Sequence, residues 1–141
     1  MNAILIKSLL VLQKKALRLI TSSNLRYSSA PIFYHLKLLP IPEVYDLNCL
    51  KFLYKCMVSD RFPSLKQRIL DNKSSHNYET RFKSLLKPPF VRLHICKKAY
   101  LSHSIYLWNN LDPCVKESKS LHSFKFKIKQ ILLENIKPPE L

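Results

Sequence analysis

Residues 43–58, EVYDLNCLKFLYKCMV, decide how this sequence folds. At about 100° per residue, a helix over this stretch presents apolar side chains on two faces. The first face carries Leu47, Leu50, Tyr54 and Met57, and the second carries Tyr45, Cys49, Phe52 and Cys56. A helix that is apolar on two faces is typical of the centre of a domain, since both faces need covering. We therefore expect the rest of the chain to pack around this helix.

Further helices are expected on both sides of this central one. Proline at the first helical position predicts starts at Pro31 and Pro63, with helices to about residues 38 and 70. Apolar periodicity predicts helices over about residues 3–21, 98–111 and 121–135, the last capped by Ser118 or Ser120. Alternation of apolar and polar side chains at residues 91–95 indicates a strand. The predicted fold is mainly α, a small multi-helix domain with at most a short β-hairpin around residues 81–95.

The length and composition fit a single domain over residues 1–141. Apolar residues make up 47% of the chain and charged residues 23%, which is close to the globular average. Within that domain we expect a basic amphipathic helix at residues 1–22 and a helical centre at residues 30–70. A loop that can include the hairpin follows at residues 71–97, and the C-terminal helices occupy residues 98–135.

The first helix combines an apolar stripe with a basic face. Spacings of four and three residues place Leu5, Leu9, Leu12, Ala16 and Leu19 on one stripe, which predicts that they belong to the core. The opposite side gathers Lys7, Lys14, Lys15 and Arg18. An acid-free, basic, amphipathic start is also typical of a mitochondrial presequence, and that alternative stays open.

The net charge of +15 is concentrated at the two ends of the chain. The first carboxylate is Glu43, so residues 1–42 contain basic residues and no acid. A second basic group, Lys125, Lys127 and Lys129, surrounds the apolar stripe of the last helix. Basic flanks around a nearly neutral middle favour a polyanion partner, most often nucleic acid, over a merely solvated surface. Arg81 joins the candidate contacts because its guanidinium suits phosphate oxygens.

Several classes of site are excluded by the residues that are missing. The chain has no glycine, so it cannot form a glycine-rich phosphate-binding loop. Turns that need left-handed geometry must then use asparagine or aspartate, with Asn24, Asn72, Asn77 and Asn110 available. Trp108 is expected in the core, although base stacking is an alternative.

No metal or catalytic site is predicted. The four aspartates, Asp46, Asp60, Asp71 and Asp112, form no adjacent pair that could hold two metal ions. The four cysteines form no CxxC pair and are expected to be reduced thiols of an intracellular protein, about half of them in the core. A zinc set of His94, Cys96, His103 and Cys114 is conceivable, but its spacing matches no standard zinc motif. We therefore expect no catalytic residue, no metal and no cofactor.

Six phrases of the sequence occur in a recognisable order. They are residues 12–20 (LQKKALRLI), residues 30–33 (APIF) followed by residues 38–41 (LLPI), residues 52–55 (FLYK), residues 76–81 (HNYETR), residues 107–109 (LWN) and residues 123–125 (SFK). Together, across residues 12–133, they resemble the region that follows the reverse transcriptase domain in LINE-type (non-LTR) retrotransposons of the jockey-like families. The chain departs from that pattern at Glu79, where the family has Asn, at Ser104-Ile105, where it has Gly-Pro, and at Asp112, where it has Pro.

The resemblance implies a truncated, non-catalytic C-terminal region of a larger RNA-directed DNA polymerase. Such a region would support the parent reverse transcriptase domain and contact the backbone of RNA or DNA, with no membrane and no small-molecule substrate. The expected contacts are Lys7, Lys14, Lys15, Arg18, Arg81, Lys125, Lys127 and Lys129. Two alternatives remain open, a purely structural scaffold module and a retrotransposon remnant without function.

Overall fold

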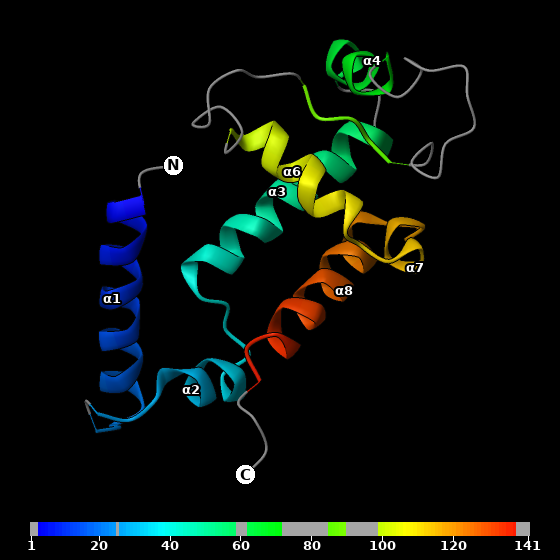
Figure 1. Cartoon of the computed structure of the whole chain (residues 1–141). Coiled ribbons are helices and arrows are strands. Elements are labelled where there is room, and N and C mark those ends of the chain that lie inside the picture. Colours follow the sequence, from blue (N-terminus) through cyan, green and yellow to red (C-terminus); the bar gives the residue numbers. More distant parts are fainter. Residues whose placement is uncertain (1–2, 25, 59–61, 72–84, 90–98, 138–141) are drawn as a thin grey trace. The chain divides into compact units, whose positions relative to one another are not determined.

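The computed structural model describes residues 3–24, 26–58, 62–71, 85–89 and 99–137. The described residues form helices and no strand (Figure 1). The helices are α1 (Ala3–Ile20), α2 (Ser29–His35), α3 (Ile41–Val58), α4 (Pro63–Asp71), α6 (Tyr100–Asn109), α7 (Pro113–Lys116) and α8 (Leu121–Glu134). The prediction of a mainly α fold is confirmed. The predicted hairpin at residues 81–95 lies outside the described residues except at residues 85–89, which are not in a strand.

The chain divides into two compact units. Unit 1 comprises Met1–Leu47 and Lys125–Leu141, and unit 2 comprises Asn48–Phe124. Helices α3 and α8 contribute residues to both units, so each is described below by the part that lies in one unit. The prediction of a single domain over residues 1–141 stays a prediction.

The centre of unit 2 is the second half of α3, as its two apolar faces predict. Buried side chains from α3, α4 and α6 meet in one cluster, to which residue 86 adds a leucine. The members of this cluster are Leu53, Cys56, Ile69, Leu86 and Ile105, and Trp108 packs against it from α6. Cys49 and Cys56 are fully buried, whereas Cys114 is exposed. The helical pattern of residues 98–111 predicts a buried Ala99, and this prediction is wrong: Ala99 precedes α6 as its N-cap and is exposed.

Three aromatic rings of unit 2 pack against one another. The Tyr54 ring stacks on the Phe124 ring with their centroids 4.4 Å apart, and Trp108 lies 5.8 Å from Phe124. The buried Tyr54 hydroxyl donates a hydrogen bond to the Ser118 carbonyl oxygen at 2.6 Å. A buried hydroxyl without a hydrogen-bond partner costs free energy, and this bond avoids that cost. The same bond fixes the orientation of the Tyr54 ring. Trp108 is half-buried and serves packing, as expected.

In unit 1, α1 is joined to the chain that follows α2 by one side chain. The Gln13 amide donates from Nε2 to the Leu39 carbonyl oxygen at 3.0 Å, and its Oε1 accepts the Ile41 N–H at 3.0 Å. Leu17, one turn after Gln13 on the same face, is buried against Ile32 and Phe33 of α2. This face of α1, with Gln13 and Leu17, is the one that the fold covers.

The predicted core stripe of α1 is therefore wrong. Its large members are strongly exposed: Leu5 61%, Leu9 50%, Leu12 60% and Leu19 78%, and Ala16 is exposed as well. The stripe lies roughly 100° round the helix from Gln13 and Leu17, so covering one face leaves the other uncovered. The predicted helix is confirmed, and the predicted buried face is wrong.

Two helices of unit 1 end in left-handed residues although the chain has no glycine. Ser22 (φ 50°) follows α1 and Lys37 (φ 51°) follows α2. Each ending is a Schellman motif, in which the N–H of the residue after the left-handed one donates to a carbonyl oxygen five residues earlier. These bonds are Ser23 N–H to the Arg18 carbonyl oxygen at 2.9 Å and Leu38 N–H to the Phe33 carbonyl oxygen at 3.0 Å.

The prediction that asparagines would supply such geometry is wrong for the residues described. Asn110 has φ −84° at the end of α6, and Asn24 is not among the described residues with positive φ. Asn24 instead accepts the Arg26 N–H with its side chain at 3.1 Å, which is an Asx turn. Asn72 and Asn77 lie outside the described residues.

Candidate nucleic-acid interface

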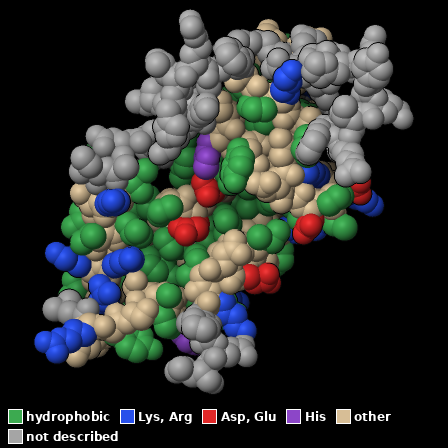
Figure 2. Space-filling model, in the orientation of Figure 1, with side chains coloured by type: hydrophobic (Ala, Val, Ile, Leu, Met, Phe, Trp, Pro, Cys, Tyr) green, Lys and Arg blue, Asp and Glu red, His purple; other side chains and the backbone are tan. Residues whose placement is uncertain are grey.

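The basic face of α1 is the largest of the predicted contact groups. Lys7 and Lys15 are exposed, and Lys14 and Arg18 are half-buried. At about 100° per residue, all four occupy a sector on the side of the helix away from the Leu5 stripe. Figure 2 shows Lys and Arg side chains gathered over α1. The sector forms because α1 is a continuous helix from residue 3 to residue 20 without a carboxylate.

Arg18 is partly engaged within the protein. Its Nε and Nη2 groups donate hydrogen bonds to the Tyr27 carbonyl oxygen at 3.2 Å and 3.1 Å. The guanidinium has five N–H donors in a planar fork, so these two bonds orient the group without using all its donors. The same bonds hold the turn between α1 and α2. Arg18 therefore contributes structure as well as charge.

Lys14 has an acidic neighbour. Burial raises the pKa of the Glu43 carboxyl above its ordinary value and Asp46 adds to the rise, whereas a backbone hydrogen bond at Glu43 and, to a smaller extent, the nearby Lys14 ammonium oppose it. The Oε2 atom of Glu43 is buried and has no hydrogen-bond partner among the described residues. Glu43 lies in the first turn of α3, where the helix dipole favours a carboxylate, but loss of solvation outweighs that benefit. Part of the positive potential of Lys14 is thus compensated within unit 1.

The lysines of α8 do not share one face. Lys125 and Lys129 are four residues apart on one side of the helix, and Lys127 lies on another side. Lys125 is exposed, whereas Lys127 and Lys129 are half-buried. Arg81, the remaining candidate, lies outside the described residues. Of the predicted residues, the structure brings together the four on α1 and, separately, the pair Lys125 and Lys129.

Sequence reasoning missed two exposed lysines, Lys55 and Lys119, which line one groove of unit 2. They are far apart along the chain, and neither belongs to a basic run. Only the packing of α3 beside the start of α8 within unit 2 brings them to one place. The clustering of basic residues along the sequence, which identified the basic face of α1, could not have identified these two lysines.

Residues in several of the six phrases that carry the resemblance have structural roles. Gln13, in residues 12–20, bonds to the backbone of Leu39 and Ile41, in residues 38–41. Three other phrases, residues 52–55, 107–109 and 123–125, supply the three aromatic rings that pack together in unit 2. Ser104, at one of the departures, is fully buried and its hydroxyl donates to the Tyr100 carbonyl oxygen at 2.6 Å.

The described part of the chain was searched for groups of metal ligands and for membrane-spanning helices. Within it, no group of three or more His, Cys, Asp or Glu side chains is placed to hold a metal ion. The zinc alternative is not decided by this, since His94 and Cys96 lie outside the described residues. None of the described helices has the length and apolar character that crossing a membrane requires.

Comparison of the chain with family models, with curated proteins and with solved structures finds no match.

Proposed function

We propose that this chain is a non-catalytic, nucleic-acid-contacting region that corresponds to the C-terminal part of a non-LTR retrotransposon reverse transcriptase. In this role it supports the polymerase domain of the parent protein and contacts the RNA or DNA backbone. The observation that carries the proposal is the α1 sector formed by Lys7, Lys14, Lys15 and Arg18, on a helix without acidic residues.

The chemistry of that sector suits phosphate better than base edges. Lysine ammonium groups act as point charges on flexible stems, and Arg18 can offer its remaining donors to a phosphate oxygen. Contacts of this kind position a protein on a nucleic acid without reading its sequence. We therefore expect binding that tolerates sequence and weakens steeply with salt.

A scaffold module is the second candidate, and one observation favours it. Four leucines of α1 are at least half exposed along one stripe. Contiguous exposed apolar surface is characteristic of protein interaction sites. In this role the stripe docks on the parent polymerase domain, and the lysines only keep the chain soluble.

The deciding experiment titrates the full chain into labelled single-stranded RNA and duplex DNA across a salt series. The two exposed lysines of α1 are reversed together, Lys7→Glu with Lys15→Glu. The matched control, Lys37→Glu with Lys87→Glu, makes the same change in net charge at exposed lysines outside α1. Circular dichroism checks that each variant folds.

We expect micromolar or tighter binding by the natural chain. The α1 variant should bind at least about tenfold more weakly near physiological salt, and its log–log salt slope on duplex DNA should fall by about two. The control should lose much less. Equal losses in the two variants would mean that only net charge matters, and absence of binding by folded protein would leave the scaffold candidate.

A further inference from the structure

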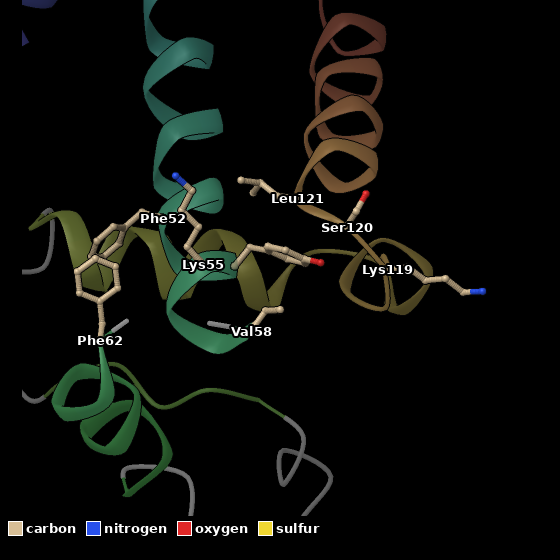
Figure 3. A pocket seen from close by; sticks show the side chains of 8 residues that line it. Phe52, Lys55, Val58, Phe62, Lys119, Ser120 and Leu121 are labelled. Atoms are coloured by element: carbon tan, nitrogen blue, oxygen red, sulfur yellow. The ribbon is translucent and has the colours of Figure 1, made fainter. Parts of the chain in front are cut away.

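Unit 2 contains an open groove of about 620 Å³. Eight residues line it: Phe52, Tyr54, Lys55 and Val58 from α3, Phe62 before α4, and Lys119, Ser120 and Leu121 at the start of α8. Figure 3 shows these side chains from close by. The volume lies within the range of sites for small molecules, about 300–1,000 Å³. None of the described basic residues proposed to contact nucleic acid belongs to this unit.

The apolar part of the groove is held rigidly at its base and is open at its edge. Tyr54 is only 3% exposed, stacked on Phe124 and bonded to the Ser118 carbonyl oxygen, so its ring is fixed. Phe52 and Phe62 form a side wall, with ring centroids 6.0 Å apart. Val58 is 62% exposed and Phe62 is 42% exposed, so apolar surface remains available to a ligand.

The charged lining of the groove is basic throughout. Lys55 and Lys119 are both exposed, and no Asp or Glu belongs to the described lining. Helix α8 begins at Leu121 in the lining, so the positive end of its dipole adds to the same potential. Figure 3 shows the Lys119 side chain extending away from the apolar side chains. An exposed lysine changes rotamer within nanoseconds, so its ammonium can turn toward an anion at the edge of the groove.

We propose that this groove binds an amphiphilic anion, a small molecule with an apolar body and one acidic head. The body lies on Val58 and Phe62, and the carboxylate, sulfonate or phosphate head is held by Lys55 and Lys119. The site is independent of the proposed nucleic-acid contacts. It was not predicted from the sequence because its lining comes from segments far apart along the chain.

A nucleobase fits this lining less well than an aliphatic or aromatic body. A base has several hydrogen-bonding groups on its edges, and leaving them unpaired costs free energy. The polar groups of the apolar part are few: the Tyr54 hydroxyl already donates to Ser118, and the Ser120 hydroxyl accepts the Ser123 N–H at 3.1 Å. The exposed aliphatic surface of Val58 adds contact area without any hydrogen bond.

The test uses the full chain and two fluorescent probes that share a ring system. Anilinonaphthalene sulfonate carries an anionic head, and phenylnaphthylamine is its uncharged counterpart. Val58→Glu places a carboxylate in the groove, and Val11→Glu makes the same change at a half-exposed valine of α1. Lys55→Gln with Lys119→Gln removes the positive charge, and decanoate is added to displace the bound probe.

We expect one sulfonate probe per chain, bound at least tenfold more weakly by Val58→Glu and unchanged by Val11→Glu. The double lysine variant should weaken the sulfonate about tenfold and leave the neutral probe unchanged, and decanoate should displace both. Val58→Trp, which narrows the groove, should also weaken binding, and it replaces Val58→Glu if circular dichroism shows that variant unfolded. Equal effects at Val58 and Val11, or equal effects of the lysine variant on both probes, would overturn the proposal. Displacement by oligothymidylate in place of decanoate would also overturn it and assign the groove to nucleotides.

Discussion

The Asn109 side chain pairs with both backbone groups of Leu86. Its Oδ1 accepts the Leu86 N–H at 3.0 Å, and its Nδ2 donates to the Leu86 carbonyl oxygen at 2.8 Å. One side-chain amide thus supplies the hydrogen-bond partners that the backbone N–H and carbonyl oxygen of Leu86 need when they are removed from water. Because the Leu86 side chain is buried in the main cluster of unit 2, this pairing fixes residues 85–89 against α6. The asparagine of the resembling phrase at residues 107–109 therefore has a structural role.

Replacing Asn109 should destabilise the chain measurably. Asn109→Ala removes both bonds and leaves two partly buried backbone groups of Leu86 unpaired, at an expected cost of about 2–3 kcal/mol. Asn109→Asp keeps the acceptor and loses the donor, so its cost should also be substantial. Asn110→Ala, at an exposed neighbour, is the control and should change stability by less than about 1 kcal/mol. Urea unfolding followed by circular dichroism measures all three, and equal midpoints for Asn109→Ala and Asn110→Ala would contradict the assigned role.

Glycine at position 37 should stabilise the chain. Lys37 adopts φ 51°, where its Cβ costs roughly 1–2 kcal/mol that glycine avoids. Glycine also loses more backbone entropy on folding, so the net gain should be about 0.5–1 kcal/mol. Leu36→Gly, one residue earlier at φ −78°, is the matched control and should destabilise instead. Thermal unfolding should rank Lys37→Gly above the natural chain and Leu36→Gly below it, and the opposite ranking would exclude a left-handed cap at Lys37.

Glu43 should make stability depend on pH. Burial raises the pKa of its carboxyl in the folded chain above the ordinary value of 4.5. A carboxyl with a raised pKa binds its proton more tightly when folded, so its contribution is most favourable below pH 4.5 and is lost as pH rises through the folded pKa. Glu43→Gln removes the ionisation and should raise the unfolding free energy at neutral pH by less than about 1 kcal/mol, since solvent screens a side chain that is only partly buried.

The gain from Glu43→Gln should disappear at acidic pH, where the natural side chain is itself neutral. Unfolding in urea across a pH series measures the difference between the two chains. Glu117→Gln, at an exposed glutamate, is the control and should change stability by less than about 0.5 kcal/mol. A gain at Glu43 that stays constant from acidic to neutral pH would show that burial of the charge is not its cause.

The helices and the centre of unit 2 could be predicted from the sequence, because they depend on the apolar periodicity of neighbouring residues. Apolar side chains on two faces of residues 43–58 predicted a central helix, and Cys49, Leu50, Tyr54 and Cys56 of those faces are indeed buried. The sequence predicts that Ser118 or Ser120 caps α8. Ser120 is the capping residue, because its hydroxyl oxygen accepts the Ser123 N–H. Ser118 instead donates its hydroxyl to the Val115 carbonyl oxygen.

The buried face of α1 could not be predicted, because residues far along the chain select it. Period alone shows which side chains share a face and does not show which face is covered. Gln13 holds α1 to Leu39 and Ile41, more than twenty residues away, and this orients Leu17 toward α2. The candidate nucleic-acid face depends on the same choice, since Lys14 and Arg18 become half-buried next to the covered side. The two backbone hydrogen bonds of Gln13 thus select the covered face of α1, although the leucine stripe is the more apolar face.

Substitutions in the two apolar sectors of α1 should therefore differ sharply in effect. Leu17 is 4% exposed, so Leu17→Ala should cost about 2–5 kcal/mol through lost contacts and a cavity. Leu12 and Leu19 are 60% and 78% exposed, so Leu12→Gln and Leu19→Gln should each change stability by less than about 0.5 kcal/mol. Urea unfolding compares the three, and sedimentation should show less self-association in the two glutamine variants because exposed apolar area falls. If Leu12→Gln or Leu19→Gln costs as much as Leu17→Ala, the leucine stripe is covered in the folded chain and cannot serve as a docking surface. If the costs separate as expected, the stripe is free for a partner.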